Sequence, residues 1–201
     1  MRNKNWSLGA VFFAFFILVL GNSLGQAQEF KENIYDPGQL KPVDSELKVE
    51  KGDPAPDFEL PSISGDRVRL RDYQGQKHVM LSFVPAAWTP VCSDQWPGYD
   101  LLQEEFQARD TVVLGITADN IPTLHAWTKA MDGLWFPVLS DFWPHGEAAE
   151  KYGVLRSDGT TERALIFIDK QGVVRFAHVS DINKRPSLET VMQGLQSLQA
   201  E

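Results

Sequence analysis

The run from His78 to Val84 is the sequence feature that most constrains the fold. It is almost continuously apolar, as expected of a central strand covered on both faces of a sheet. The segment from Thr111 to Thr117 is rich in β-branched residues and predicts a second buried strand. Between them, a helix is expected from Cys92 to about Ala108, with a kink or restart at Pro97. Buried strands that alternate with helices indicate a layered α/β domain.

The rest of the chain extends this pattern of strands and helices. A hairpin is expected before the first buried strand and another near the carboxyl end, where a final amphipathic helix follows. Asn120 is a candidate cap for a helix, and Gly153 a candidate stop for another. The expected elements are strands at 58–60, 68–70, 136–139, 164–168 and 173–177, and helices at 121–131, at 146–152 and from Ser187.

The amino terminus has the pattern of a targeting segment. Arg2 and Lys4 precede an apolar run from Leu8 to Leu20, and small residues up to Ala27 follow. Residues 1–27 are therefore interpreted as a signal peptide or as a membrane anchor, although the run is shorter than the ~20 residues of a spanning helix. Both interpretations place the domain outside the cytoplasm, in the periplasm or the extracellular space.

The remaining residues divide into an arm and one domain. Residues 28–51 are polar with little periodicity and are interpreted as a linker arm. Residues 52–201 are expected to form a single domain. The net charge is −8 and there is no Lys- or Arg-rich run, so the footprint of a nucleic-acid-binding protein is missing. The chain has one cysteine, Cys92, and so cannot form an internal disulfide.

The loop from Pro85 to Cys92 is the candidate functional motif. It leaves a buried strand and opens a helix, so Cys92 is expected in the first helical turn. Unpaired backbone N–H groups and the positive end of the helix dipole favour a thiolate there. The Thr89 hydroxyl would donate to the thiolate or accept from a peroxide O–H. Pro85 and Trp88 carry no charge and would shield the sulfur from bulk water.

This motif resembles that of a known family. Pro85-Ala86-Ala87-Trp88-Thr89-Pro90-Val91-Cys92 has the pattern P-x-x-x-T-x-x-C, which is similar to the motif of the peroxiredoxins. The resemblance extends from about Gly52 to the last helix. The segments 136–141 and 142–146, FPVLSD and FWPHG, resemble the one-cysteine AhpE-type branch. Arg163 falls where peroxiredoxins carry their active-site arginine.

The resemblance implies a thioredoxin-like fold with a central mixed sheet flanked by helices, and it implies roles for individual residues. Cys92 would be the peroxidatic cysteine and Thr89 its hydroxyl partner. Arg163 would supply a guanidinium and Pro85 a shield. The backbone N–H groups of Val91 and Cys92 would hold the peroxide beside Trp88. Neither a cofactor nor a metal is implied.

The implied reaction is the reduction of hydrogen peroxide or an organic hydroperoxide through a sulfenic acid at Cys92. Because there is no second cysteine, an external thiol must resolve that acid, either a thioredoxin-like protein or a small thiol. The aromatic turn near Trp143 is a candidate surface for a homodimer. One departure from many relatives is Gln95, which stands where they have glutamate three residues after the cysteine.

Two alternatives of the same fold are weighed against the peroxidase. An exported thiol–disulfide oxidoreductase would need C-x-x-C, whereas this chain has Cys92-Ser93-Asp94-Gln95. A non-enzymatic module, such as a metal chaperone or assembly factor, would need further ligands. His78, His125 and His178 are scattered along the chain and lack metal-ligand spacing.

Overall fold

The computed structural model describes residues 28 and 30–199. The chain divides into two units, one ending at Ile34 and the other beginning at Tyr35. In the first unit, residues 30–32 are helical. The predicted signal peptide or anchor, residues 1–27, lies outside the described residues. Among those that are described, no helix combines the length and the apolar character that a membrane crossing requires.

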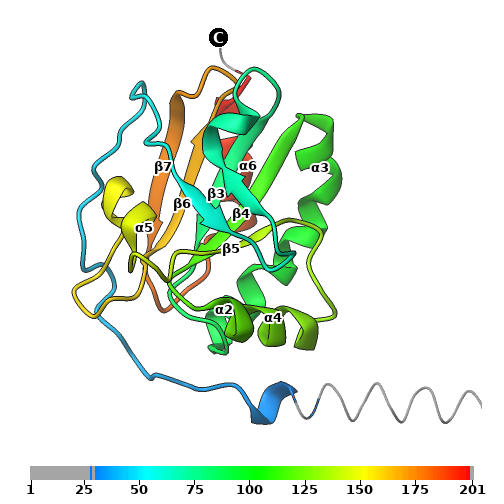
Figure 1. The fold of residues 1–201 in the computed structure, drawn as a ribbon, viewed down its shortest axis with the longest axis vertical. Coiled ribbons are helices and arrows are strands. Elements are labelled where there is room, and N and C mark those ends of the chain that lie inside the picture. The colour runs from blue at the N-terminus through cyan, green and yellow to red at the C-terminus, as the bar shows by residue number, and fades with distance from the viewer. Residues whose placement is uncertain (1–27, 29, 200–201) are drawn as a thin grey trace, which may run out of the picture. The chain divides into compact units, whose positions relative to one another are not determined.

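A five-stranded mixed sheet forms the centre of the second unit (Figure 1). Its strands lie in the order β5-β4-β3-β6-β7. Strands β3, β4 and β5 are parallel, and β6 and β7 are each antiparallel to their inner neighbour. The bounds are β3 His78–Phe83, β4 Thr111–Thr117, β5 Val138–Ser140, β6 Arg163–Ile168 and β7 Val174–Ser180.

The pairing of β3 with β6 brings two segments that are distant in the sequence together, at the carboxyl end of β3 and the amino end of β6. Phe83 at the end of β3 is opposite Ala164 near the start of β6. The loop that leaves β3 and the first residue of β6 therefore lie together, although they are far apart in the sequence. The functional site lies at this end of the two strands.

One face of the sheet is covered by the hairpin β1–β2 and by α5. The hairpin pairs Glu59–Pro61 with Arg67–Arg69, and the 3₁₀ helix η1, Leu70–Tyr73, follows it. Helix α5 spans Glu147–Tyr152 and buries its tyrosine completely. Apolar side chains of β3, β4 and β6 pack against these elements and form the main hydrophobic core.

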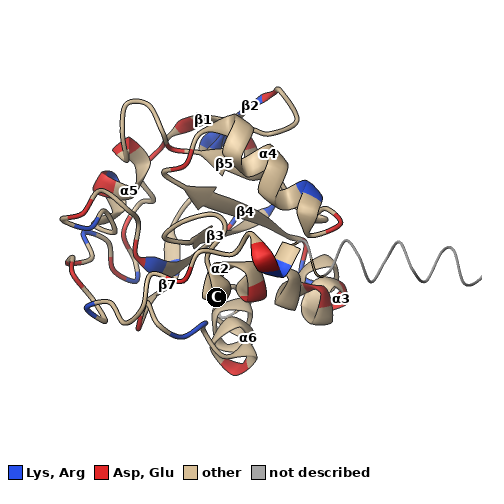
Figure 2. Ribbon diagram, turned by 90° about the horizontal axis from the view of Figure 1, so that it is seen from below, with Lys and Arg blue, Asp and Glu red and all other residues tan. Residues whose placement is uncertain are grey.

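The opposite face is covered by helices that include α2, α3 and α6, which Figure 2 shows on the other side of the sheet from β1 and β2. Gly115 in β4 allows a close approach on this face. A Cβ atom there would lie 2.9 Å from Cζ2 of Trp96, so the indole packs directly on the strand. Trp96 also contacts Trp127, with ring centroids 5.1 Å apart. The bounds are α2 Pro90–Gln95, η2 Pro97–Leu102, α3 Gln103–Ala108, α4 Ile121–Ala130 and α6 Leu188–Ser197.

The local signals in the sequence explain where these helices begin and end. Pro97 divides the expected long helix into α2, η2 and α3. The Asn120 side chain accepts a hydrogen bond from the Thr123 N–H and caps α4. Ser187 caps α6 in the same way. Gly153 ends α5 in the left-handed conformation, with φ of 71°. The predicted layered α/β architecture with a central mixed sheet is confirmed.

Residues 35–49 have neither helix nor strand, yet they are hydrogen-bonded to the domain. The fully buried Glu162 carboxylate accepts from the backbone N–H groups of Asp44 and Ser45. The same carboxylate pairs with Arg156 at 2.7 Å, and Arg156 donates to the Lys41 carbonyl. These contacts hold the second half of the predicted arm against the domain.

Candidate active site

Cys92 lies in the first turn of α2, where the sequence predicts it. The six-residue helix begins at Pro90, directly after the loop that leaves β3. Pro90 suits this first position because proline has no N–H to satisfy and a fixed φ. Cys92 is completely buried, with 0% exposure. A peroxide must therefore enter between the loop 85–91 and the side chains around the sulfur to reach it.

Arg163 is the charged group beside the sulfur. It is the first residue of β6, and its guanidinium Nη2 lies 3.4 Å from the Cys92 Sγ. The side chain is almost fully buried, at 2% exposure. A cation this close stabilises negative charge that develops on an adjacent oxygen.

The guanidinium is held in place by two other acceptors. The Ile182 carbonyl accepts from Nε at 3.1 Å and from Nη2 at 3.0 Å. The Gln95 Oε1 accepts from Nη1 at 2.6 Å. Because three of its nitrogen atoms are engaged, the planar group has one orientation, with Nη2 directed at Cys92.

Gln95 is oriented in turn by buried hydroxyl groups. Its Nε2 donates to the Tyr99 hydroxyl at 2.8 Å and to the Ser82 Oγ at 3.3 Å. Burial raises the pKa of Tyr99, which therefore keeps its proton at neutral pH. The amide thus presents its oxygen to Arg163 and its nitrogen to Tyr99. Gln95 thereby supplies the hydrogen bond to the arginine without a carboxylate.

The other predicted site residues surround Cys92 in the loop. The Thr89 hydroxyl donates to the Ala86 carbonyl at 2.9 Å. Its one proton is used there, so in this arrangement its lone pairs remain to accept a hydrogen bond from a peroxide. Pro85 is buried, and Trp88 and Val91 are partly exposed. Trp88 has φ of 60°, an uncommon conformation for a residue with a side chain.

A cavity of about 490 Å³ opens beside this loop. Arg163, Thr89 and Val91 contribute to its wall, and Pro85 lies among them. Residues 35–40 also line the cavity. The cavity therefore leads from the surface to the guanidinium that contacts the Cys92 sulfur.

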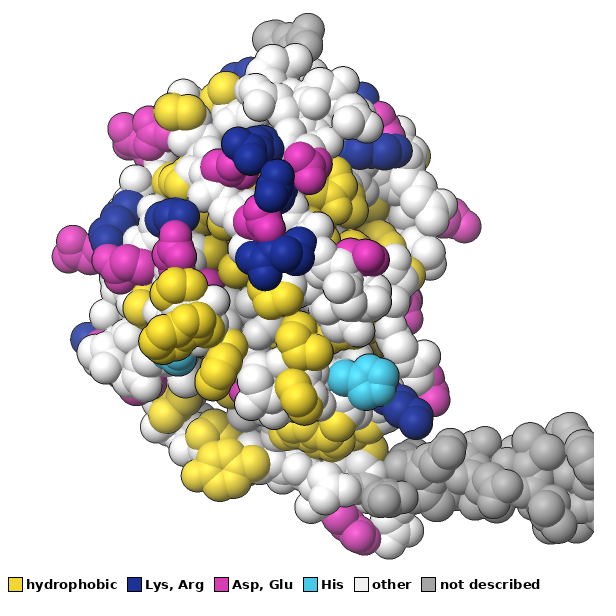
Figure 3. All heavy atoms as spheres, viewed as in Figure 1, with side chains coloured by type: hydrophobic (Ala, Val, Ile, Leu, Met, Phe, Trp, Pro, Cys, Tyr) yellow, Lys and Arg dark blue, Asp and Glu magenta, His cyan; other side chains and the backbone are white. Residues whose placement is uncertain are grey.

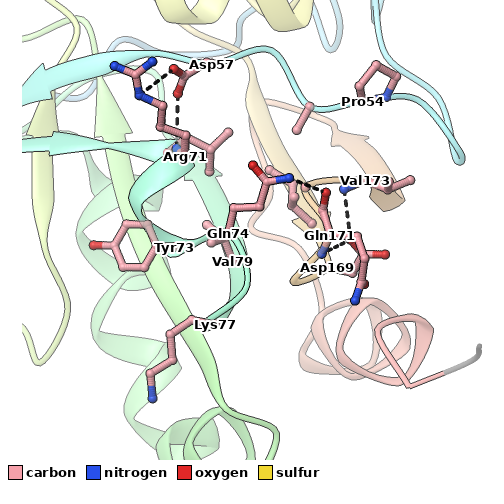
Figure 4. Close-up of a pocket in the computed structure, with 14 residues that line it drawn as sticks. Pro54, Asp57, Arg71, Tyr73, Gln74, Lys77, Val79, Asp169, Gln171 and Val173 are labelled. Carbon is pink, nitrogen blue, oxygen red and sulfur yellow. Dashed lines mark hydrogen bonds and ion pairs between the residues drawn. The ribbon is translucent and has the colours of Figure 1, made fainter.

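A second cavity, of about 210 Å³, lies at the other end of β3 (Figure 4). Lys77 and Val79 line it at the start of that strand. Its Asp169 carboxylate accepts from the backbone N–H groups of Gln171 and Val173, as Figure 4 shows for the second of these. This carboxylate stabilises the turn between β6 and β7, and the cavity is separate from the cysteine.

Sequence reasoning brought Cys92, Arg163 and Thr89 to one site and missed how the arginine is held. The Ile182 carbonyl belongs to the backbone, and no residue type marks such an acceptor. Tyr99 follows Gln95 by four residues, a spacing that places two side chains on one face of a helix. That spacing was the available signal for the Gln95–Tyr99 contact.

A single buried cysteine at a helix start, paired with a fixed arginine on a mixed α/β sheet, defines a thiol-dependent peroxidase of the thioredoxin-like fold. The chain belongs to the AhpC/TSA family, whose model matches residues 51–177. The resemblance to peroxiredoxins noted in the sequence is confirmed.

Individual relatives agree with this assignment. The chain is 38% identical to alkyl hydroperoxide reductase E of Mycobacterium tuberculosis over 132 residues, which are 64% of this chain and 84% of the relative. It is 32% identical to the chloroplastic 2-Cys peroxiredoxin BAS1 of Spinacia oleracea, over 74% of this chain and 59% of the relative. Among solved structures, reduced Plasmodium vivax 2-Cys peroxiredoxin has a TM-score of 0.69 at 27% identity and covers 75% of this chain and 82% of its own.

Proposed function

We propose that this protein reduces hydrogen peroxide and organic hydroperoxides with Cys92 as its one redox-active thiol. The observation that carries the proposal is the 3.4 Å contact between the Cys92 Sγ and the Arg163 guanidinium. A fixed cation beside a buried thiol is what a nucleophilic attack on a peroxide oxygen requires. Family membership and the identity to alkyl hydroperoxide reductase E support the same activity.

In the first half of the reaction, the Cys92 thiolate attacks the nearer peroxide oxygen. A sulfur–oxygen bond forms as the oxygen–oxygen bond breaks, and the electron pair goes to the departing oxygen. That oxygen takes up a proton and leaves as an alcohol, or as water from hydrogen peroxide. Arg163 and the first-turn N–H groups of Val91 and Cys92 would stabilise its negative charge, and Thr89 would accept the peroxide O–H.

In the second half, an external thiol attacks the Cys92 sulfenic acid and releases water, which leaves a mixed disulfide. A second thiol then releases Cys92 and carries away the disulfide. The donor is a thioredoxin-like protein or a small thiol, because the sequence holds no second cysteine. Without a donor, a second peroxide oxidises the sulfenic acid to sulfinic acid, which ends turnover.

The test is the oxidation of the reduced full-length chain by hydrogen peroxide. We expect mass spectrometry to find one added oxygen on Cys92 and the tryptophan fluorescence to change at the same rate, because Trp88 is in the same loop. A Cys92→Ser variant serves as the control and should show neither change. If excess hydrogen peroxide leaves the reduced Cys92 thiol unmodified, the proposal is wrong. Insulin reduction by the same preparation would instead favour a thiol–disulfide oxidoreductase.

Export to the periplasm or the extracellular space is a further proposal, supported by the pattern of residues 1–27. Fractionation of cells that make the tagged chain would test it. Recovery of the uncleaved chain in the cytoplasm would contradict it, and recovery in the membrane fraction would favour the anchor.

A homodimer formed through the aromatic turn is also proposed. Trp143 is 80% exposed and Phe142 48% exposed, and Figure 3 shows exposed hydrophobic side chains gathered on the lower part of the face in view. Large exposed apolar side chains commonly mark an interaction surface. Sedimentation of the wild type and a Trp143→Ser variant would test this, since only the wild type should dimerise.

A further inference from the structure

Residues 35–40 form one wall of the cavity that leads to Arg163, and we call them the strap. In Figure 1 the strap is part of the blue segment at the end of the domain where α2 lies. The family model matches only residues 51–177, so the strap lies outside the matched region. The loop that carries Thr89 and Val91 lines the same cavity. The organic part of a peroxide that enters this cavity would therefore contact residues of the loop and of the strap.

The strap is fixed at both ends by hydrogen bonds. At one end the Tyr35 N–H donates to the Trp88 carbonyl at 2.8 Å. At the other end the Asn183 side chain accepts from the Leu40 N–H and donates to the Leu40 carbonyl, both at 2.9 Å. The neighbouring Ile182, whose carbonyl holds Arg163, donates its N–H to the Pro42 carbonyl at 3.0 Å. The wall is thus part of the assembly that positions the arginine.

Most of the cavity lining is apolar, from strap, loop and the segment after β7. The contributing residues are Pro37, Leu40, Pro85, Pro90, Val91 and Ile182. An organic substituent would bury apolar surface against them, which contributes about 25 cal/mol per Å² removed from water. Hydrogen peroxide has no such substituent and would gain nothing from these contacts.

Two carboxylates also line the cavity, Asp36 in the strap and Asp158 outside it. Asp36 accepts from the Gly38 N–H at 2.9 Å. Asp158 accepts from the Thr160 N–H at 2.9 Å and the Thr160 hydroxyl at 2.7 Å. These bonds fix the position of both carboxylates. Burial opposes ionisation of Asp158, but the two hydrogen bonds from Thr160 outweigh it and lower the pKa of this carboxyl.

Arg163 is the one cation among the residues that line the cavity, and it faces Cys92 and Gln95. Arg156 lies 3.6 Å from Asp158 but forms its closer ion pair, at 2.7 Å, with Glu162. The approach to the sulfur therefore carries net negative charge, and a substrate with its own carboxylate would be repelled at close range.

We propose that the strap and Asp158 make this site selective for uncharged organic hydroperoxides over hydroperoxides that carry a carboxylate. The inference rests on the proposed peroxidase function and names its substrate class. Tyr35 and Leu40 supply apolar contact for the substituent, while Asp36 and Asp158 disfavour an anion. None of the four takes part in bond breaking.

The first test compares a short-chain hydroperoxy acid with its own methyl ester. The two differ in charge and share the reacting group, so the ratio of their rates of Cys92 oxidation isolates the charge effect. We expect the ester to react about three- to ten-fold faster at low ionic strength, with the ratio shrinking as salt is added. The Asp36→Asn/Asp158→Asn variant should bring the ratio close to one, since asparagine can accept the same turn hydrogen bonds.

The matched control for charge is Asp66→Asn/Asp132→Asn, which removes two exposed carboxylates outside the cavity lining. It should keep the wild-type ratio. Equal rates for acid and ester in the wild type would overturn the proposal, and so would a ratio that the Asp36/Asp158 variant leaves unchanged.

The second test addresses the apolar wall. Tyr35→Ala and Leu40→Ala should each lower the rate with cumene hydroperoxide relative to hydrogen peroxide by about three-fold or more. The control is Leu101→Ala, because Leu101 is 75% exposed and outside the cavity lining, and its ratio should be that of the wild type. An unchanged ratio in both strap variants would overturn the proposed contact.

The peroxidase function and the substrate selectivity are contradicted by different results. If hydrogen peroxide does not oxidise Cys92, the peroxidase function is wrong and the substrate class falls with it. If hydrogen peroxide oxidises Cys92 normally but the variants leave both rate ratios unchanged, only the proposed selectivity is wrong.

Discussion

Replacement of Arg163 by methionine is the sharpest test of how this site works. Methionine keeps much of the length and apolar volume of arginine and removes every N–H donor. At 3.4 Å from the sulfur, a unit charge interacts with a thiolate by about 5 kcal/mol at an effective dielectric constant of ~20. Only the part of this interaction energy that increases as charge moves to the departing oxygen accelerates the reaction. Loss of one such donor typically slows a reaction by about 10²–10³-fold.

The assay is stopped-flow oxidation by hydrogen peroxide under excess peroxide, followed by tryptophan fluorescence. The variant lacks the donor that stabilises the negative charge on the departing oxygen, so its transition state lies higher in free energy. We expect the rate of Cys92 oxidation to fall by about 10²-fold.

Stability must be measured beside the rate, because the Gln95 Oε1 and the Ile182 carbonyl lose their donor in the variant. Each unpaired buried acceptor costs about 1–3 kcal/mol. The control is Arg175→Met, which removes a partly buried arginine paired with Asp169 near the second cavity. It should react at the wild-type rate. A folded Arg163→Met protein that reacts within three-fold of wild type would refute the role assigned to the guanidinium.

Three further predictions concern stability. Glu162→Ala should lower the free energy of unfolding in urea by about 3–5 kcal/mol, because it leaves the buried Arg156 charge without its partner; a loss below 1 kcal/mol would contradict this. Burial lowers the pKa of His78 and of His178 below the ordinary 6.5, so the unfolded chain binds more protons just below that pH. Stability should therefore fall as the pH drops below about 6.5, and His78→Gln/His178→Gln should show a smaller fall in melting temperature between pH 7.5 and 5.5; an equal fall would refute the assignment. Gly153→Ala should destabilise the protein by more than 1 kcal/mol in the same urea assay, since its φ is 71° and a Cβ would collide with a backbone oxygen; wild-type stability would contradict that.

The fold was predictable where local pattern and tertiary role agree. The apolar run from His78 predicts a central strand correctly, because both faces of β3 are covered. Asn120 and Ser187 mark helix starts because the side chain of each accepts a hydrogen bond from the backbone N–H three residues on. β7 runs past the expected end at Ala177 to Ser180, since pairing with β6 extends it. That extension depends on the partner strand, which local pattern does not describe.

The site was predictable for residues whose chemistry is local. Cys92 and Thr89 share one loop, and the helix start explains both. Arg163 came from the family resemblance, because nothing near it in the sequence points to Cys92. Gln95 and the Ile182 carbonyl both accept hydrogen bonds from the Arg163 guanidinium. These contacts join segments that only the fold brings together, so the sequence did not predict them.

Gly115 connects the sheet to the reactivity of the cysteine. Its missing side chain lets the Trp96 indole rest on β4, and Trp96 is the residue that directly follows α2. A single methyl group at this position would lift the end of that helix from the strand and move the sulfur relative to the guanidinium. The alignment of a nucleophile with its activating cation is thus set partly by the absence of one carbon atom, on a strand that carries none of the reacting groups.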